Sequence, residues 1–546
     1  MYYRICPIVS IFPGSIKIQQ LTPSCRFRRY SSVPKPPISS GLKNDDVPHV
    51  TVIRPCKGKE PYLYQCLAST FKQAYPHDKL TIYLCVSSRE DAAYSTIERV
   101  LRDYPEHDAT LLVEEENPAL NPVSPHDSKL GPNPKIRNMS RAYREAKGDI
   151  VWILDCNVWV GRGACGRMVD RLHGYSHSGQ KRPFKFVHHL PLAIDVSSVE
   201  AAHNDHSDDN YEDLPALTTV PSKDLLPASA SYFGGRLDEA FLSSAHAKMY
   251  VAINTVAVAP CICGKSSMFR RSHLNALTNN DKSTDTRFGS GIDYFSENIC
   301  EDHLIGDLLW KARIPDTMPA AAKSWKNHGL LYGDLAIQPV ADMSMSNYIA
   351  RRVRWLRVRK YTVPAATLVE PGTESFVCSA MGAFGATSSS YTKTYFGDSW
   401  LHMVLLWTVS IAIWIVVDWT VYILLQSGKT VEITSSGDQQ KTHVPPFAQP
   451  LGARGSGSRR PFMTWLKAWL SREALALPVW TWAIWGGATV VWRDKKLWVG
   501  FDMKVYELDG DNTSPQRVPL LSGDHNGTSQ ANGRPASQNG LKARQD

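Results

Sequence analysis

The segment "WILDCNVWV" places a carboxylate, Asp155, at the end of an apolar run that predicts a strand, with Asn157 two residues later. A carboxylate at such a strand end can hold a divalent cation, which in turn bridges the two phosphates of a nucleotide-sugar. Magnesium and manganese both prefer oxygen ligands and keep waters and substrate phosphates as the others. The alternative is that Asp155 only caps the following turn. The residue types alone leave both roles open.

A second acidic pair, Glu301 and Asp302, opens the segment "EDHLIGDLLW", whose apolar residues recur at helical spacing. Acidic residues in a first helical turn stabilise a helix through its dipole. The other reading is chemical, because a carboxylate at this position can act as a general base that takes a proton from an attacking hydroxyl.

The segment "NYIARRVRWLRVRK", residues 347–360, holds five arginines and a lysine around one tryptophan. Three ligands suit it: nucleic acid, an anionic membrane surface, or the phosphates of a small molecule. Arg351, Arg354 and Trp355 share one helix face, and arginine forks match phosphate oxygens. Fixed positive charge there would stabilise a departing diphosphate. The remaining cations precede an apolar region and suit anionic headgroups on the cytosolic side; they are Arg352, Arg357, Arg359 and Lys360.

Composition narrows these choices. The chain has 546 residues and a net charge of only +9, and it contains no recognisable nucleic-acid-binding module, so no nucleic-acid partner is expected. Its 11 cysteines are scattered, which favours reduced, cytosol-facing thiols, and Cys261 and Cys263 have the wrong spacing for a zinc site. Most of the 16 tryptophans lie late in the chain, as in the aromatic belts of membrane proteins.

Alternating strand and helix patterns begin after a proline- and serine-rich linker at 32–48 and predict an α/β fold with a doubly wound, mainly parallel sheet. In such sheets ligands bind beyond the carboxyl ends of the strands, which makes Arg54–Lys57, Ser87–Asp91 and Asp155–Asn157 neighbours in one cleft. The expected strands are 49–55, 81–87, 109–115, 149–155 and 184–193, and the expected helices are 60–73, 91–104 and 133–148.

Two later segments predict membrane helices. Leu401 to Leu425 is apolar and long enough to span a bilayer, and Ala474 to Val491 is just long enough, with Pro478 expected to kink it. The short, small-residued stretch 376–386 suits either a tightly packed span or a re-entrant piece.

The chain therefore divides into four expected parts: a leader and linker at 1–48, a catalytic domain at 49–370, a membrane region at 371–500 with two or three helices, and a disordered polar tail at 501–546. Polar, aperiodic insertions are expected within the catalytic domain near 201–230 and 275–290. The first thirty residues combine arginine and serine without acidic residues, as in a mitochondrial presequence or an unstructured leader. We expect them to contribute nothing to the chemistry.

Asp91, Asp155, Asp302 and the R-x-x-R-W at Arg351–Trp355 resemble the D, D, D, (Q/R)xxRW signature of processive and lipid-directed glycosyltransferases. The likeness to one family runs from about residue 31 to 506 and includes the words "VIRPCKG", "NPKIRN", "VHHLP", "EDHLIGD", "RRVRWLRVRKYTV" and "WLSREALALPVW". They resemble the fungal form of the ceramide glucosyltransferase family, glycosyltransferase family 21.

This resemblance implies a GT-A-type catalytic domain, UDP-glucose as donor, ceramide as acceptor and transfer with inversion. It also implies a divalent cation, Mg2+ or Mn2+, and a multi-pass protein of Golgi or ER/Golgi membranes whose catalytic domain faces the cytosol among membrane lipids. Matched by position, Asp155 is linked to the metal, Asp302 is the proton acceptor, and the other matches bind substrate: Asp91, Lys135, His188, Arg351, Arg354 and Trp355.

The chain departs from the family pattern at two places. Family members usually have a transmembrane helix before the catalytic domain, and the first thirty residues here contain no such run. In "CVSSRED", Ser88 and Glu90 stand where animal relatives are more acidic. Two other functions stay open: a processive polysaccharide synthase, which would normally have more membrane spans, and a membrane adaptor with a degenerate transferase domain. The presence of all the expected carboxylates disfavours the adaptor.

Overall fold

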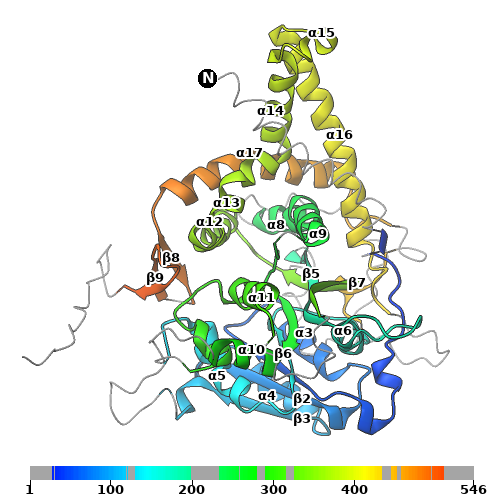
Figure 1. The fold of residues 1–546 in the computed structure, drawn as a ribbon, viewed down its shortest axis with the longest axis vertical. Coiled ribbons are helices and arrows are strands. Elements are labelled where there is room, and N and C mark those ends of the chain that lie inside the picture. Colours follow the sequence, from blue (N-terminus) through cyan, green and yellow to red (C-terminus); the bar gives the residue numbers. More distant parts are fainter. Residues whose placement is uncertain are drawn as a thin grey trace, which may run out of the picture.

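The computed structural model describes an α/β body that carries a helical projection at one end (Figure 1). The described residues are 28–29, 31–118, 120, 130–197, 233–257, 259–279, 289–314, 325–432, 444–451, 457–493 and 495–508. The leader up to residue 27, the expected insertion near 201–230 and the tail beyond residue 508 lie outside these ranges. The second expected insertion, near 275–290, instead begins as the end of helix α10 (Arg271–Asn279), while 280–288 lie outside the described residues.

Seven strands form the main sheet, in the order β3-β2-β1-β4-β6-β5-β7. Strands β3, β2, β1 and β4 are parallel, β6 is antiparallel to both of its neighbours, and β5 and β7 are again parallel to each other. The predicted α/β class with a mainly parallel sheet is thus confirmed, although no sequence pattern predicted β6 or β7. The strands are β1 Val50–Pro55, β2 Leu80–Val86, β3 Asp108–Val113, β4 Ile150–Leu154, β5 Phe184–Asp195, β6 Ser266–Arg270 and β7 Lys326–Val340.

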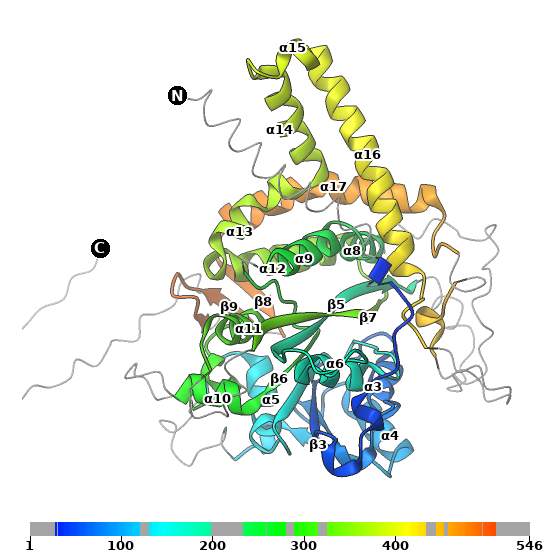
Figure 2. The same ribbon diagram turned by 45° about the vertical axis from the view of Figure 1, so that its right-hand side comes forward.

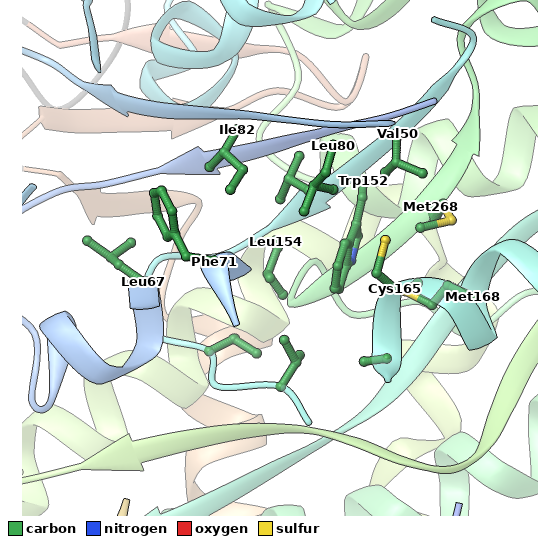
Figure 3. Packing of buried hydrophobic residues seen from close by; sticks show 14 of the residues in the cluster. Val50, Leu67, Phe71, Leu80, Ile82, Trp152, Leu154, Cys165, Met168 and Met268 are labelled. Carbon is green, nitrogen blue, oxygen red and sulfur yellow. The ribbon is translucent and has the colours of Figure 1, made fainter. Parts of the chain in front are cut away.

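Helices cover both faces of this sheet. One face packs against α3 (Leu63–Phe71), α4 (Tyr94–Asp103) and α6 (Ala164–His173), and Figure 3 shows side chains of α3 and α6 against those of β1, β2 and β4. The other face packs against α5 (Pro134–Arg144), α10 and α11 (Glu301–Lys311). Every residue of β1, β2 and β4 is buried, as expected for strands covered on both faces.

Helix α5 begins where its sequence predicts. The Asn133 side chain accepts hydrogen bonds from the backbone N–H groups of Lys135 and Ile136, and Pro134 occupies the first turn. The helix ends at Arg144, before the expected stop at Gly148, whose φ of +70° suits glycine. This cap fixes the direction in which the Lys135 side chain leaves the helix.

The proline- and serine-rich segment 32–48 packs against the body instead of forming a free linker. The carboxylate of Asp170, on α6, accepts hydrogen bonds from the backbone N–H groups of Ile38 and Ser39 at 2.6 and 2.7 Å. Gly166, on the same helix, lies against Pro37: a Cβ added at Gly166 would be 2.6 Å from the Cβ of Pro37. The segment therefore belongs to the catalytic body.

Helix α16 (Trp400–Gln426) is 27 residues long and covers the first predicted membrane segment, Leu401 to Leu425. Within the described part of the chain it is the one helix long and apolar enough to cross a bilayer, and 6% of its apolar window is buried. Its last turns, including Asp418 and Tyr422, are buried against the catalytic body.

The second predicted membrane helix is wrong. Residues 474–491 are divided between α17 (Phe462–Trp485), which contains Pro478, and β8 (Thr489–Trp492). Strand β8 forms a small antiparallel sheet with β9 (Lys495–Val499) and β10 (Val505–Glu507). One continuous span is therefore excluded over this range.

The short stretch 376–386 lies in α14 (Ser375–Ser388), which runs beside α16. The Ser410 hydroxyl donates to the Ser379 hydroxyl at 2.8 Å, and the Trp407 indole donates to the Phe376 carbonyl at 3.1 Å. At a rise of about 1.5 Å per residue, α14 is about 21 Å long, which is short for a bilayer core of about 30 Å. Because α16 returns the chain to the catalytic body, the chain from α14 to α16 must cross any bilayer that α16 crosses, so the length of α14 alone decides neither alternative.

Candidate active site

Asp155 is held between two lysines at the carboxyl end of β4. Its Oδ1 lies 3.0 Å from Lys135 Nζ and its Oδ2 lies 3.1 Å from Lys265 Nζ. Because β6 runs antiparallel to β4, the residue before β6 lies beside the residue after β4, and the Asp155 N–H donates to the Lys265 carbonyl at 3.0 Å. Lys265 also donates to Asn157 Oδ1 at 3.3 Å. Both carboxylate oxygens thus contact cations, which disfavours the simple capping role.

Lys135 links Asp155 to a second carboxylate. Its ammonium group lies 3.4 Å from Glu301 Oε1 and donates to the Gly264 carbonyl at 3.3 Å. The other oxygen of Glu301 accepts a hydrogen bond from Asn133 Nδ2 at 3.1 Å. The residue that caps α5 and the residue that opens α11 therefore hold the lysine between them.

The charged groups in this cluster shift one another's pKa values. Burial alone would raise the pKa of Asp155, but Lys135 and Lys265 outweigh it and lower the pKa to about 2. Burial likewise opposes the charge of Lys135, yet Asp155 and Glu301 outweigh it and raise the Lys135 pKa above its ordinary value. Burial raises the pKa of Glu301, against the opposing charge of Lys135. Asp155 and Lys135 consequently remain ionised at neutral pH.

Asp302 lies in the first turn of α11, directly against Gly264. A Cβ on Gly264 would lie 2.8 Å from Asp302 Oδ2 and 3.0 Å from Asp302 Cβ. The two residues line one cavity together with Lys135 and Glu301. The structure thus brings the predicted base to the same cavity as the lysine that contacts Asp155.

The loop that carries Gly264 and Lys265 should position Asp302 through this contact. We expect Gly264→Ala to displace the carboxylate and to lower the transfer rate by about 10²-fold, since misplacement by about 1 Å has that effect. Steady-state transfer at matched protein levels measures it. Gly41→Ala is the control, because no atom lies within 4 Å of a Cβ at that glycine. Equal activities of the two variants would contradict the proposed positioning.

The other strand ends meet as predicted. Arg54 is fully buried and donates to the carbonyls of Cys156 and Val158 at 3.0 and 2.9 Å, which supports the loop after Asp155. Asp91 accepts hydrogen bonds from the Gly58 and Ala93 N–H groups at 2.7 and 3.0 Å. Asp91 therefore joins the loops that follow β1 and β2, and its expected role in donor binding stays a prediction.

His188 lies behind the cavity. It has no exposed surface, and burial lowers its pKa well below the ordinary value, so the ring is neutral at physiological pH. Its Nδ1 lies 2.5 Å from the Tyr250 hydroxyl, which accepts a hydrogen bond from the Cys263 N–H at 3.3 Å. His188 also packs against Phe186, which lines the cavity, and its expected role in substrate binding stays a prediction.

Helix α12 (Met345–Thr362) carries the arginine motif. The Arg351 guanidinium lies over the Trp355 ring, 4.8 Å from its centre, and donates to Gln338 Oε1 at 3.3 Å. Arg354 has no carboxylate partner among the residues that the structure describes, and burial together with Arg351 lowers its pKa to about 10. A partly buried arginine in this state favours an anionic ligand.

The remaining cations of this helix all contact protein groups in this structure, and their expected contact with headgroups stays a prediction. Arg352 and Arg359 both pair with Glu370, at 3.1 and 3.6 Å. Arg357 donates to two backbone carbonyls between α17 and β8, each at 2.6 Å, and Lys360 donates to the Gly487 carbonyl at 2.7 Å. Arg357 and Lys360 thus fasten α12 to the segment that follows α17, whereas Arg352 and Arg359 fasten it to the nearby Glu370.

Sequence reasoning missed Lys265 and did not use Gly264. Both belong to the segment "CICGKSS", whose role depends on β6, a strand of only five residues. The lysine becomes part of the site only because that strand pairs antiparallel with β4.

A carboxylate at the start of α11 beside an ionised strand-end aspartate, with an arginine on α12 that has no carboxylate partner among the described residues, suits a glycosyltransferase that uses a nucleotide-sugar. The family described as glycosyl transferase family 21 matches residues 24–204 and 225–505. The ceramide glucosyltransferase of Pyricularia oryzae is 48% identical over 493 residues, covering 88% of this chain and 90% of the relative. That of Gibberella zeae is 43% identical over 504 residues, covering 89% and 91%. The chain belongs to glycosyl transferase family 21, and the expected enzyme class is confirmed.

Similarity to solved structures is low. A mannosyltransferase from Pyrobaculum calidifontis, in complex with GDP-Man and Mn2+, aligns with 76% of this chain and 96% of its own at 15% identity, with a TM-score of 0.35. The S. aureus TarS 1–349 structure aligns with 85% of this chain and all of its own at 12% identity, with a TM-score of 0.26. These values say nothing about the donor or the metal of this chain.

Proposed function

We propose that this chain transfers glucose from UDP-glucose to the primary hydroxyl of ceramide with inversion, which yields β-glucosylceramide and UDP. The observation that carries the proposal is the position of the Asp302 carboxylate in one cavity with Lys135, which contacts Asp155. An inverting displacement requires one base for the attacking hydroxyl and positive charge for the leaving diphosphate. Asp302 supplies the base, and the lysines and arginines supply the charge.

The donor would bind across the carboxyl ends of β1, β2 and β4. Asp91 holds the β1 and β2 loops that would frame the uridine. Arg354, with Arg351 and Trp355 beside it, would contact the diphosphate. The lipid acceptor would approach from the side that carries α16, and we propose a Golgi or ER/Golgi membrane with the catalytic body facing the cytosol.

The strand end at Asp155 offers a divalent cation, Mg2+ or Mn2+, two oxygen ligands. Asp155 and Asn157 provide a carboxylate and an amide oxygen at one strand end, and the described residues contain no group of three or more potential ligands. Such a site suits a cation that takes its other ligands from water and substrate phosphates. When bound, the cation would neutralise charge on the diphosphate. In this structure Lys135 and Lys265 provide the positive charge around Asp155.

A processive polysaccharide synthase is the second candidate, and the membrane region disfavours it. Such enzymes normally need several spans to form a channel, and the described residues contain one candidate span. The test is mass spectrometry of microsomes supplied with UDP-[13C]glucose and ceramide. We expect a labelled monohexosylceramide that a β-glucosidase degrades. Label in a polymer, or no transfer by folded protein, would refute the proposal.

Arg354→Lys should impair the enzyme although it keeps the charge, because lysine cannot reproduce the planar fork that matches phosphate oxygens. We expect turnover to fall by about 10²-fold, the effect of removing one stabilising donor. The measurement is glucosylceramide formation with UDP-glucose varied. Arg357→Lys, on the same helix, should remain close to the unmodified enzyme, since a lysine can still donate to a backbone carbonyl. Equal losses would mean that Arg354 has no special role.

A further inference from the structure

Both ends of α17 are fixed to the catalytic body. Before its first turn, Arg460 pairs with Glu239 at 3.0 Å, and Glu239 belongs to α8 (Gly234–Leu242), which packs on β5. After its last turn the chain forms β8, β9 and β10, and the Val505 N–H of β10 donates to the Glu297 carbonyl at 2.7 Å, close to α11. Lys504 also pairs with Glu297. A helix about 36 Å long cannot cross a bilayer while both ends are held on one side.

The two faces of α17 differ. The inner face is buried and includes Arg472, whose guanidinium pairs with Glu374 at 2.8 Å, and Trp469, whose indole donates to Asp418 of α16 at 2.7 Å. The outer face is almost entirely apolar, and Lys467 is its one charged residue. Its large apolar side chains are strongly exposed: Met463 61%, Leu470 39%, Leu477 44%, Trp482 64% and Trp485 77%.

This apolar face continues the surface of the candidate span. Figures 1 and 2 show α17 lying across the base of the hairpin that α14 and α16 form. The exposed apolar side chains of α16 are Trp400, Leu401, Val404, Leu405, Val409, Ile413 and Val416. A lipid layer that surrounds α16 would therefore meet the outer face of α17 at its surface.

The sheet that follows α17 limits how deep the helix can lie. Unpaired strand edges cannot be placed in hydrocarbon, because their N–H and C=O groups would lack partners. The strands β8 to β10 form an open three-stranded sheet, in which Lys495 of β9 pairs with Glu507 of β10 at 3.0 Å. The sheet thus keeps the carboxyl end of α17 outside the hydrocarbon of the bilayer.

We propose that α17 is an in-plane membrane helix: it lies in the interfacial layer of the leaflet that faces the catalytic body, with its apolar face among the acyl chains. The chain after α16 then never crosses the bilayer, and β10 stays on the catalytic side. The partner is a lipid surface, and the inference does not depend on which sugar or acceptor the enzyme uses.

Depth-dependent fluorescence quenching tests this placement in the full-length protein reconstituted into phosphatidylcholine–phosphatidylserine vesicles. An environment-sensitive fluorophore is attached at Met463→Cys, Leu470→Cys or Trp485→Cys, and labelling of the unmodified chain gives the background. We expect all three positions to lose more fluorescence to a spin-labelled lipid with its nitroxide near the headgroups than to one with its nitroxide near the chain ends. Val409→Cys, in α16, should show the opposite preference.

Two outcomes of this experiment would overturn the proposal. Deeper quenching at Leu470 than at both ends would mean that the helix crosses the bilayer. Absence of lipid quenching at all three positions, with Val409 quenched, would mean that another protein or water covers this face. An epitope added after Asp546 provides a measurement that requires no change in α17. It should be digested by protease in sealed microsomes whose cytosolic side faces outward, and its protection would also overturn the proposal.

Discussion

Asp302→Asn is expected to lower glucosylceramide formation by about 10²- to 10⁴-fold, the usual contribution of a general base. The amide has nearly the same shape as the carboxylate, so the contact with Gly264 should persist. UDP-glucose binding should change little, because the lysines contact Asp155 and Glu301 rather than Asp302. Single-turnover transfer and equilibrium binding of the nucleotide-sugar separate these two effects.

Asp307→Asn is the matched control for this substitution. Asp307 lies on the same helix and pairs with Lys311 at 2.8 Å on the surface, where such pairs contribute little to stability. Its activity should equal that of the unmodified enzyme. Activity of the Asp302 variant within a few-fold of the unmodified enzyme would remove Asp302 from the role of base. A parallel loss of nucleotide binding would indicate a structural role instead.

Asp155→Asn should weaken both donor binding and the fold. The substitution leaves the Lys265 ammonium beside amide oxygens and leaves Lys135 with the Glu301 carboxylate and the Gly264 carbonyl. Removing one partner of a buried ion pair typically lowers the free energy of unfolding by about 3 kcal/mol or more. UDP affinity and its dependence on Mg2+ or Mn2+ should fall together. Nucleotide titration with and without metal, and chemical unfolding in detergent, measure the two effects.

The unfolding free energy that Asp155→Asn removes should become smaller as the pH falls. Because the folded-state pKa of Asp155 is lowered to about 2 from an ordinary value of 3.8, its stabilisation is fully present above the ordinary value and disappears as the pH falls toward 2. The difference in unfolding free energy between the two proteins should therefore be constant above about pH 5 and shrink below it. Asp108→Asn is the control, since Asp108 and Lys147 form an exposed pair at 2.6 Å. An unchanged UDP affinity would contradict the donor-site role of Asp155.

Local sequence was sufficient for the framework of the catalytic body. Strands such as β1 and β2 are continuous apolar runs because both faces of the sheet are covered, and such runs are visible without any knowledge of the fold. The placement of Asp91 and Asp155 beyond parallel strands then follows from a general property of these sheets. The start of α11 at Glu301 and the length of α16 were also predictable, because each depends on neighbours along the chain.

Only the tertiary structure decided which distant groups each of these side chains contacts. Lys265 reaches Asp155 through antiparallel pairing of β6, His188 contacts the Tyr250 hydroxyl, and Arg357 binds carbonyls 129 and 132 residues away. The second apolar segment is not a span because distant contacts hold both ends of α17 on one side. Periodicity and residue type report which face of an element is apolar. They do not report which distant residues contact that face, because this depends on the packing of the whole chain.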